Sequence, residues 1–578
     1  MRFVFAILCF VIAAVMIGFG IAQRTILAEP DQVVLATNVS TGTAVTVIDG
    51  ATLNAFNGSQ TLTLRGSGEI FAAYGRTSDI IGWIGDAKYT KVSIDPVTEQ
   101  LTSTVVPGTQ KTVPKPAGSD LWLAEYDKTS SLELTVKVPD NISFIIVSDG
   151  TKPAPPSVEL SWPLDNSTPW AGPLVIAGSI VLIVGLGLLL WAINHMRSGR
   201  GPRRKPQKMP KVPRKRVLAP AGRKALPAPE TGRRRAFIAA PLLLISALAL
   251  SGCTGVHPNP VGPSPSSTSS DIPVDSGLEP PAVTVRQVER IVSDIREVGI
   301  KADAARDSAL IATRFDSAAL QLRLANYAIR GTDPAVTALP AIPTGPVTLT
   351  LPQQTSTWPR TVLAVIQEEK DATVPPVALF LVQPDARSDY KVSYLITLEP
   401  AAKLPEVAPA NVGTSRLAVD SGVLKKTPKD AALAYGDILQ QNVDSSSYLD
   451  FEATGDTLRA AVGLTYKNSV RAALPPTARV VFGFGIGPAD EIALATNDAG
   501  GLVAVNLNET TTVTPVEAGA AVNPTGEVKA LSNIAVSTKG VVATYGYQLL
   551  FYIPAAGTNA KIVLLGYSQG LVAASEVG

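Results

Sequence analysis

Two long apolar runs in the first third of the chain predict membrane-spanning helices over residues 1–24 and 171–193. The first run, from Phe3 to Ala22, contains no charged residue and has the length that spans a hydrocarbon core of roughly 30 Å. The second run has Trp170 and Trp191 at its ends, a spacing that matches the two interfaces of a membrane. Both runs favour an integral membrane protein.

The N-terminal run has a second interpretation as a cleaved signal peptide, because Gly20-Ile21-Ala22 fits a small-residue cleavage site. Its apolar stretch is longer than that of a usual signal peptide, and no polar residue interrupts it before position 22. This length favours an uncleaved anchor.

Residues 30–160 alternate apolar and polar positions in the way that half-buried strands do. The alternation is clearest at four leucines, Leu62, Leu64, Leu132 and Leu134. Turn-forming pairs such as Asp49-Gly50 separate the runs, and no helical period competes with them. The pattern predicts an all-β, sandwich-like domain. We expect Trp83 and Trp122 in its core, with a ligand platform as the alternative.

Helical patterns followed by strand patterns occur twice after residue 281. Thr284 and Gln287 form a capping-box pattern at the start of the first predicted helix, and a second helix is predicted over 302–329. Predicted strands follow at 347–351, 361–367, 378–383 and 391–398. This first group predicts an α+β domain over residues 282–400.

The second group begins at Thr427, Pro428 and Asp430, which supply a cap, a first-turn proline and an acid for a new helix. Further predictions are helices to residue 441 and over 455–473, and strands over most of 478–575. We therefore expect a second α+β domain over residues 427–578.

Composition limits the chemistry. The two cysteines, Cys9 and Cys253, both lie in apolar runs and supply no disulfide framework. The two histidines, His195 and His257, leave little material for a metal site or a catalytic dyad. We therefore expect no catalytic, cofactor-binding or metal-binding residues.

The net charge of +2 conceals a basic, proline-rich segment over residues 197–235, with fifteen Lys or Arg residues and one acid, Glu230. This composition predicts an unfolded segment. Such runs bind nucleic acid or anionic lipid, but short basic loops also keep their side of a membrane cytoplasmic. We favour a cytoplasmic loop that contacts membrane lipid, with no nucleic-acid partner. Its topology determinants are Arg203, Arg204, Lys205, Arg214, Lys215, Arg216, Arg233, Arg234 and Arg235.

If residues 197–235 form a cytoplasmic loop, the side of the membrane on which each other segment lies follows. Residues 30–160 then lie outside the cytoplasmic membrane, and the apolar run 236–253 carries residues 254–578 to the outside again. Residues 254–281 are rich in Pro and Ser and predict a flexible linker.

The run 236–253 combines the preceding arginines, an apolar core and the tetrapeptide Leu250-Ser251-Gly252-Cys253. This pattern resembles the lipobox of bacterial lipoproteins, and the resemblance implies lipid attachment at Cys253 and cleavage just before it. Its position inside the chain departs from the family pattern. An ordinary third transmembrane helix is the alternative, and the two remain open.

The order of helices and antiparallel strands in the C-terminal half resembles tandem NTF2-like domains, in which helices pack on a curved sheet. The resemblance implies modules for assembly or ligand binding, without naming a ligand. The fold class expected for the whole chain is a multi-domain membrane protein: an exported β-sandwich-like domain, two to three transmembrane helices and an exported tandem α+β region.

One segment, Gly566-Tyr567-Ser568-Gln569-Gly570, resembles the nucleophile elbow of α/β-hydrolases in its cutinase form. No histidine follows Ser568 to act as its base, so we interpret the segment as a terminal strand. We likewise interpret Gly483, Gly485 and Gly487 as part of a strand and not as a phosphate loop.

The sequence therefore predicts a non-enzymatic cell-envelope membrane protein. Its exported domains would bind or scaffold at the outer face of the cytoplasmic membrane, with envelope proteins as partners. An accessory subunit of a transport or secretion assembly is the alternative, and a serine hydrolase acting through Ser568 is the remote one.

Overall fold

The computed structural model describes residues 2–27, 30–39, 42–164, 169–198, 279–371, 373–400 and 402–578. The basic segment from residue 199 on, with its nine topology determinants, lies outside the described residues. So do the run 236–253 with Cys253 and the predicted linker up to residue 278. The chain divides into two compact units, one with the two apolar helices and one with Val34–Trp162 and the chain from residue 279 onward.

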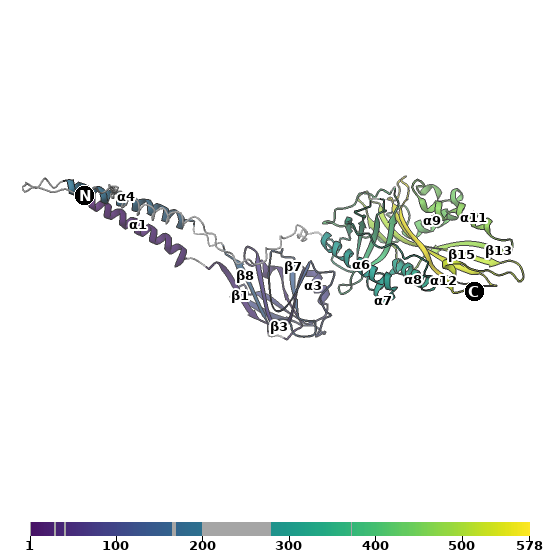
Figure 1. The fold of residues 1–578 in the computed structure, drawn as a ribbon, viewed down its shortest axis with the longest axis horizontal. Helices are drawn as coiled ribbons and strands as arrows, with labels where there is room; N and C mark the ends of the chain where they lie inside the picture. The colour runs from purple at the N-terminus through teal and green to yellow at the C-terminus, as the bar shows by residue number, and fades with distance from the viewer. Residues whose placement is uncertain are drawn as a thin grey trace, which may run out of the picture. The chain divides into compact units, whose positions relative to one another are not determined.

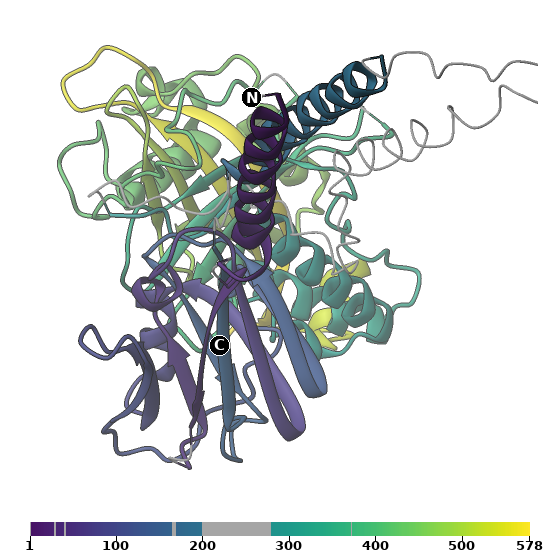
Figure 2. The same cartoon turned by 90° about the vertical axis from the view of Figure 1, so that its left-hand side faces the viewer.

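The two apolar helices are α1 (Arg2–Thr25) and α4 (Ala171–Ser198), and both are long and apolar enough to cross a membrane. They lie side by side in both views (Figure 1, Figure 2). Glycines allow this approach: a Cβ at Gly20 would come within 2.7 Å of Val175, and one at Gly178 within 2.7 Å of Ile17. Small residues at such contacts are typical of membrane helix pairs. The helices and the sheets fit a membrane-associated, multi-domain protein.

Residues 32–163, called the β domain below, carry the strands of one hydrogen-bonded sheet in the order β1-β8-β3-β7-β2-β4-β5, with β6 paired to β3. The strands are β1 (Gln32–Asn38), β2 (Val45–Ile48), β3 (Gln60–Arg76), β4 (Tyr89–Ile94), β5 (Leu101–Val106), β6 (Ala124–Val136), β7 (Ile142–Val147) and β8 (Ser157–Pro163). The predicted alternation is confirmed at the pairs Leu62↔Leu134 and Leu64↔Leu132, whose side chains are buried.

Two short helices, α2 (Gly50–Leu53) and α3 (Thr77–Ile84), interrupt the strands, so the prediction that no helix competes there is wrong. Eight residues are too few for a helical period to stand out against the neighbouring strands. Trp83 of α3 and Trp122 are both buried and contact each other edge to face at 5.5 Å, which confirms both as core residues.

The C-terminal region, residues 279–578, begins with α6 (Val285–Ala305), α7 (Ser308–Ile311) and α8 (Ser317–Thr332). The capping box of Thr284 and Gln287 is present, as predicted. The single helix predicted over 302–329 is wrong, because Arg306 adopts a left-handed conformation and Asp307 caps a new turn.

The strands that follow are β9 (Val347–Pro352), β10 (Arg360–Ile366), β11 (Val377–Gln383) and β12 (Lys391–Leu398). Next come α9 (Pro428–Gln441), α10 (Thr457–Val462) and α11 (Leu464–Ala473), and Thr427 caps α9 as predicted. Gly463 divides the helix predicted over 455–473 into α10 and α11. The remaining elements are β13 (Ala478–Ile486), β14 (Ile492–Ala495), β15 (Gly501–Pro515), α12 (Gly526–Ser532), β16 (Val541–Ile553) and β17 (Val563–Glu576).

These strands form one sheet in the order β13-β15-β16-β17-β12-β11-β10-β9, with β14 beside β15. The two α+β domains expected from the sequence therefore share a sheet. The junction is narrow, because β12 and β17 pair only at Thr397↔Tyr567 and Leu398↔Gly566. Consecutive helix-and-strand groups read as separate domains in sequence, whereas this pairing joins residues far apart along the chain.

The shared sheet curls until its two ends approach each other. Single bridges link Gln353 to Thr414 and Arg416 to Leu494, so the segment around Thr414 connects the β9 end with β14. Tyr394 of β12 also donates a hydrogen bond to the carbonyl of Asp490 at 2.8 Å. The inner face of the curled sheet buries apolar residues from both groups of strands.

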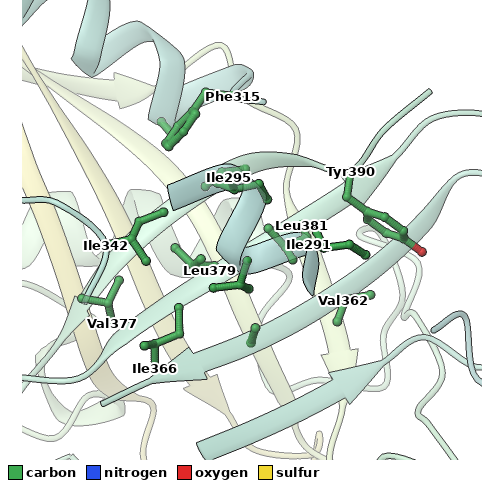
Figure 3. Packing of buried hydrophobic residues seen from close by; sticks show 14 of the residues in the cluster. Ile291, Ile295, Phe315, Ile342, Val362, Ile366, Val377, Leu379, Leu381 and Tyr390 are labelled. Carbon is green, nitrogen blue, oxygen red and sulfur yellow. The ribbon is translucent and has the colours of Figure 1, made fainter. Parts of the chain in front are cut away.

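Helices cover the outer faces of the curled sheet. Figure 3 shows Ile291 and Ile295 of α6 near strand residues such as Leu379, and Phe315 belongs to the same cluster. Helix α9 packs against β15 and β16 through Tyr435 and its neighbours. Each group of strands thus has a helical outer layer and contributes to one common inner core.

Candidate functional site: a cavity beside strand β17

A cavity of about 400 Å³ opens in the C-terminal region at the junction of β12 and β17. Helix α8, the end of β12, Thr457 of α10, Gln548 of β16 and Tyr567 to Gln569 of β17 line it. Cavities of this size and position, between elements of a folded core, are typical ligand sites.

Side chains replace backbone pairing where the two strands separate. Gln548 Oε1 accepts a hydrogen bond from the Leu395 N–H at 2.8 Å, and Ser568 Oγ accepts one from the Thr397 N–H at 3.2 Å. Buried backbone groups need such partners, so these two side chains hold the strands apart without leaving donors unpaired. The opening between β12 and β17 is therefore built into the fold.

One edge of the cavity is polar. The Glu399 carboxylate accepts hydrogen bonds from the N–H of Thr457 at 2.9 Å and from its hydroxyl at 2.8 Å. The Thr457 hydroxyl also lies 3.2 Å from the Tyr567 hydroxyl. This network orders three groups around the mouth of the cavity.

Much of the remaining lining is apolar and includes Leu322 of α8, Leu339, Val377, Leu395 and Leu398. Arg323 also lines the cavity; its guanidinium pairs with Asp303 and lies over the Phe315 ring at 4.6 Å. Tyr327 donates to the same carboxylate at 2.6 Å, and burial, together with that bond, raises the pKa of Tyr327 above its ordinary value. The positive charge is thus balanced inside the protein, which leaves an amphipathic cavity.

The segment Gly566 to Gly570 lies inside β17, which confirms the interpretation as a terminal strand. Ser568 pairs with Gln548 across the β16–β17 ladder, whereas a nucleophile elbow needs a sharp turn from strand to helix. Close packing explains both glycines. A Cβ at Gly566 would lie 2.5 Å from the Thr397 carbonyl oxygen, and one at Gly570 would lie 2.5 Å from Leu322.

Gly483 and Gly485 lie inside β13 and pair with Thr510 and Asn508, as expected for a strand. Gly487 directly follows the last residue of β13, so the strand interpretation is wrong for that glycine. His195 lies in α4, and His257 falls outside the described residues. In the part of the chain that the structure describes, no group of three His, Cys, Asp or Glu residues is arranged to hold a metal ion. Sequence reasoning singled out Ser568 but missed Thr397, Glu399, Thr457 and Gln548, because they come from different elements and form no motif.

A family model described as Domain of unknown function (DUF8094) matches residues 279–576. The match covers nearly all of the C-terminal region and every residue that lines the cavity. No curated protein and no solved structure matches the chain.

Proposed function

We propose that this chain, which belongs to the DUF8094 family, is a non-enzymatic, membrane-anchored binding protein of the cell envelope. The observation that carries the proposal is the cavity of about 400 Å³ with one polar edge and apolar walls. Its volume lies within the range of small-molecule sites. The proposed ligand is a small amphipathic molecule, whose apolar part lies against Leu322 and Leu398 and whose polar groups face Ser568 and Thr457.

The anchoring is part of the same proposal. Helices α1 and α4 hold the protein in the membrane, and the basic segment 197–235 stays cytoplasmic. Residues 30–160 and 254–578 then lie outside the cytoplasmic membrane, and Cys253 carries a lipid if the lipobox is processed. We also propose the sandwich-like class for the β domain and the NTF2-like class for the C-terminal region, supported by its helices on a curved sheet.

The proposal is tested by native mass spectrometry of the full chain after mild detergent extraction. We expect a bound small molecule in the wild-type protein and its loss in Leu322→Trp, where an indole fills the cavity. Leu449→Trp is the matched control, because Leu449 is 80% exposed and is not among the residues that line the cavity. Equal occupancy in wild type and Leu322→Trp would contradict the proposal.

The remote alternative, a serine hydrolase, requires Ser568 to act as a nucleophile, whereas a binding protein does not. The Ser568 hydroxyl accepts a hydrogen bond from the backbone of β12. Both histidines of the chain precede Ser568 in sequence. We expect p-nitrophenyl butyrate turnover at the level of buffer for wild type and for Ser568→Ala alike. Turnover by wild type that Ser568→Ala abolishes would make the protein an esterase.

A further inference from the structure

The β domain and the C-terminal region meet through buried charged residues that lie far apart in sequence. Asp79 of α3 accepts a hydrogen bond from Arg76 at 2.9 Å and one from Arg360 of β10 at 2.7 Å. Asp79 and Arg360 are almost completely buried, and Arg76 also donates to the carbonyl of Pro281 at 2.7 Å. One carboxylate thus holds an arginine from each side.

A second buried carboxylate of the β domain, Asp120, has its charged partner in the C-terminal region. Arg314 of the C-terminal region donates to Asp120 Oδ2 at 2.6 Å, and the N–H of Tyr390 donates to the same oxygen at 2.8 Å. The Asp120 side chain is 1% exposed. A carboxylate buried to this degree needs a partner, and within the described residues its ion pair comes from the C-terminal region.

Backbone carbonyls of the β domain are also bound by the C-terminal region. Arg387 donates to the carbonyls of Trp83 at 2.8 Å and Ile84 at 2.7 Å, which are the last two residues of α3. Arg290 donates to the carbonyl of Trp122 at 2.7 Å. Carbonyls in the last turn of a helix have no partner within it, so Arg387 supplies hydrogen-bond donors at the C-terminal end of α3.

An apolar contact lies between these polar groups. A Cβ on Gly82 would come within 2.7 Å of the Trp358 ring, so the indole rests directly on the backbone of α3. Ala386 belongs to the same buried cluster as Trp83 and Trp122, and the partly buried Trp358 packs against that cluster. The two sides therefore share a packed core as well as ion pairs.

These contacts point to a permanent interface. Truncating one partner of a buried, hydrogen-bonded charge pair leaves the other charge buried and unpaired, which is strongly unfavourable. Surface pairs, by contrast, contribute little and are screened by salt. Two buried carboxylates with arginine partners across the interface, around a tryptophan anchor, are characteristic of partners that stay together.

We propose that the β domain and the C-terminal region form a noncovalent complex that holds without the chain connection between them. The surface of the C-terminal region around Arg314, Trp358, Arg360 and Arg387 is a docking surface for the β domain of this chain. A chain that is cut before Cys253 would therefore remain a two-part complex, with its C-terminal part still held at the membrane by α1 and α4.

The test uses the full chain with a site-specific protease sequence inserted after Ser267 and an affinity tag at the N-terminus. Cutting there separates the C-terminal region from every predicted membrane segment, so only the proposed interface can retain it. We expect the cut C-terminal fragment to stay on the affinity resin in mild detergent, even at about 1 M NaCl, where surface charges are screened. Release of the wild-type fragment on cutting would overturn the proposal.

Variants on both sides of the interface sharpen the test. We expect Arg314→Met with Arg360→Met to reduce retention at least tenfold. Gly82→Leu should do the same from the β domain, because its side chain occupies the place of the Trp358 ring. Arg387→Ala should release the fragment measurably faster, and since Arg387 is exposed, this variant leaves the fold of its own region intact.

Arg459→Met is the matched control, because Arg459 forms a largely buried pair with Asp456 within the C-terminal region. We expect it to retain the fragment as wild type does. Protease resistance of each uncut variant checks that both parts are folded. Equal release by Arg459→Met and the interface variants, or full retention by Gly82→Leu, would overturn the proposal.

Discussion

Lys467 of α11 and Glu509 of β15 form a fully buried ion pair in the C-terminal region, with 2.6 Å between Nζ and Oε2. Burial lowers the pKa of Lys467, and the bond to Glu509 acts in the opposite direction. Burial raises the pKa of Glu509, and the bond to Lys467 acts against that rise. Each residue therefore stabilises the charged form of the other.

We predict that Lys467→Met lowers the free energy of unfolding by about 3–5 kcal/mol near pH 8, because it leaves Glu509 buried without its partner. Lys301→Met is the control, since Lys301 forms an exposed pair with Glu297, and such a pair contributes roughly 0–1 kcal/mol. Pulse proteolysis in urea measures both variants. Equal effects of the two substitutions would contradict the prediction.

The loss in Lys467→Met should depend on pH. Without Lys467 the pKa of Glu509 in the folded state rises further above its unfolded value, so the folded protein binds the extra proton more readily. The stability that protonation of Glu509 contributes to Lys467→Met is fully present below the unfolded-state pKa of Glu509. It is lost as the pH rises through the folded-state pKa. We therefore expect a smaller defect near pH 5 than near pH 8, and Glu509→Gln in the same chain should remove the difference.

Single residues were predictable only where a local pattern marked them. Trp83 and Trp122 were predicted as core residues because large aromatic residues among alternating strands are usually buried. Ser568 was singled out by a motif whose glycines prove to serve packing against β12 and α8. Glu399 and Gln548 carry no such signal, because their proximity depends on how β12, β16 and α10 are arranged.

At the scale of elements, the contact between α9 and β13 depends on a glycine. A Cβ at Gly436 would lie 2.5 Å from the Phe484 ring, which is far closer than such contacts allow. Gly436 lies inside α9, where alanine is ordinarily the better helix former by about 1 kcal/mol. At this position packing therefore favours glycine, whereas helix propensity favours alanine.

We predict that packing prevails, so that Gly436→Ala lowers the free energy of unfolding by about 1–3 kcal/mol. Gly331→Ala in α8 is the matched control, because nothing lies within 4 Å of the added Cβ. That variant should be neutral or more stable by up to about 1 kcal/mol. The urea midpoint of unfolding of the C-terminal region, measured by protease resistance, gives the change in stability for each variant. A Gly436→Ala variant that is more stable than wild type would contradict the prediction.

Elements were predicted best where the pattern is long and local. The strands predicted at 378–383 and 391–398 match β11 and β12 to within one residue, because alternation or a continuous apolar run marks them. The pairing of β12 with β17 could not be predicted, since it joins positions about 170 residues apart through two residue pairs. For this reason the sequence pattern could not show that the two groups of strands share one sheet.

At the scale of the whole molecule, the proposed docking constrains the topology. The β domain is connected directly to α1 and α4, which are long and apolar enough to cross a membrane. In the proposed topology both helices cross it, and the β domain then lies on one side. A β domain that binds the C-terminal region through Asp79 and Asp120 requires both to lie on that same side. The sequence predicts the same arrangement, with the run 236–253 crossing the membrane once more.

We therefore predict that single cysteines at Val97 of the β domain and Leu449 of the C-terminal region react alike with a membrane-impermeant maleimide on intact cells. Both side chains are highly exposed, so reactivity reports the side of the membrane and not burial. A cysteine at Met196, in the last turn of α4, should show the opposite reactivity because α4 returns the chain across the membrane. All three are placed in a chain with Cys9 and Cys253 replaced by Ser. Labelling at Val97 without labelling at Leu449 would mean that the β domain and the C-terminal region lie on opposite sides of the membrane. That result would contradict the prediction, because the buried pair of Asp120 and Arg314 requires both on the same side.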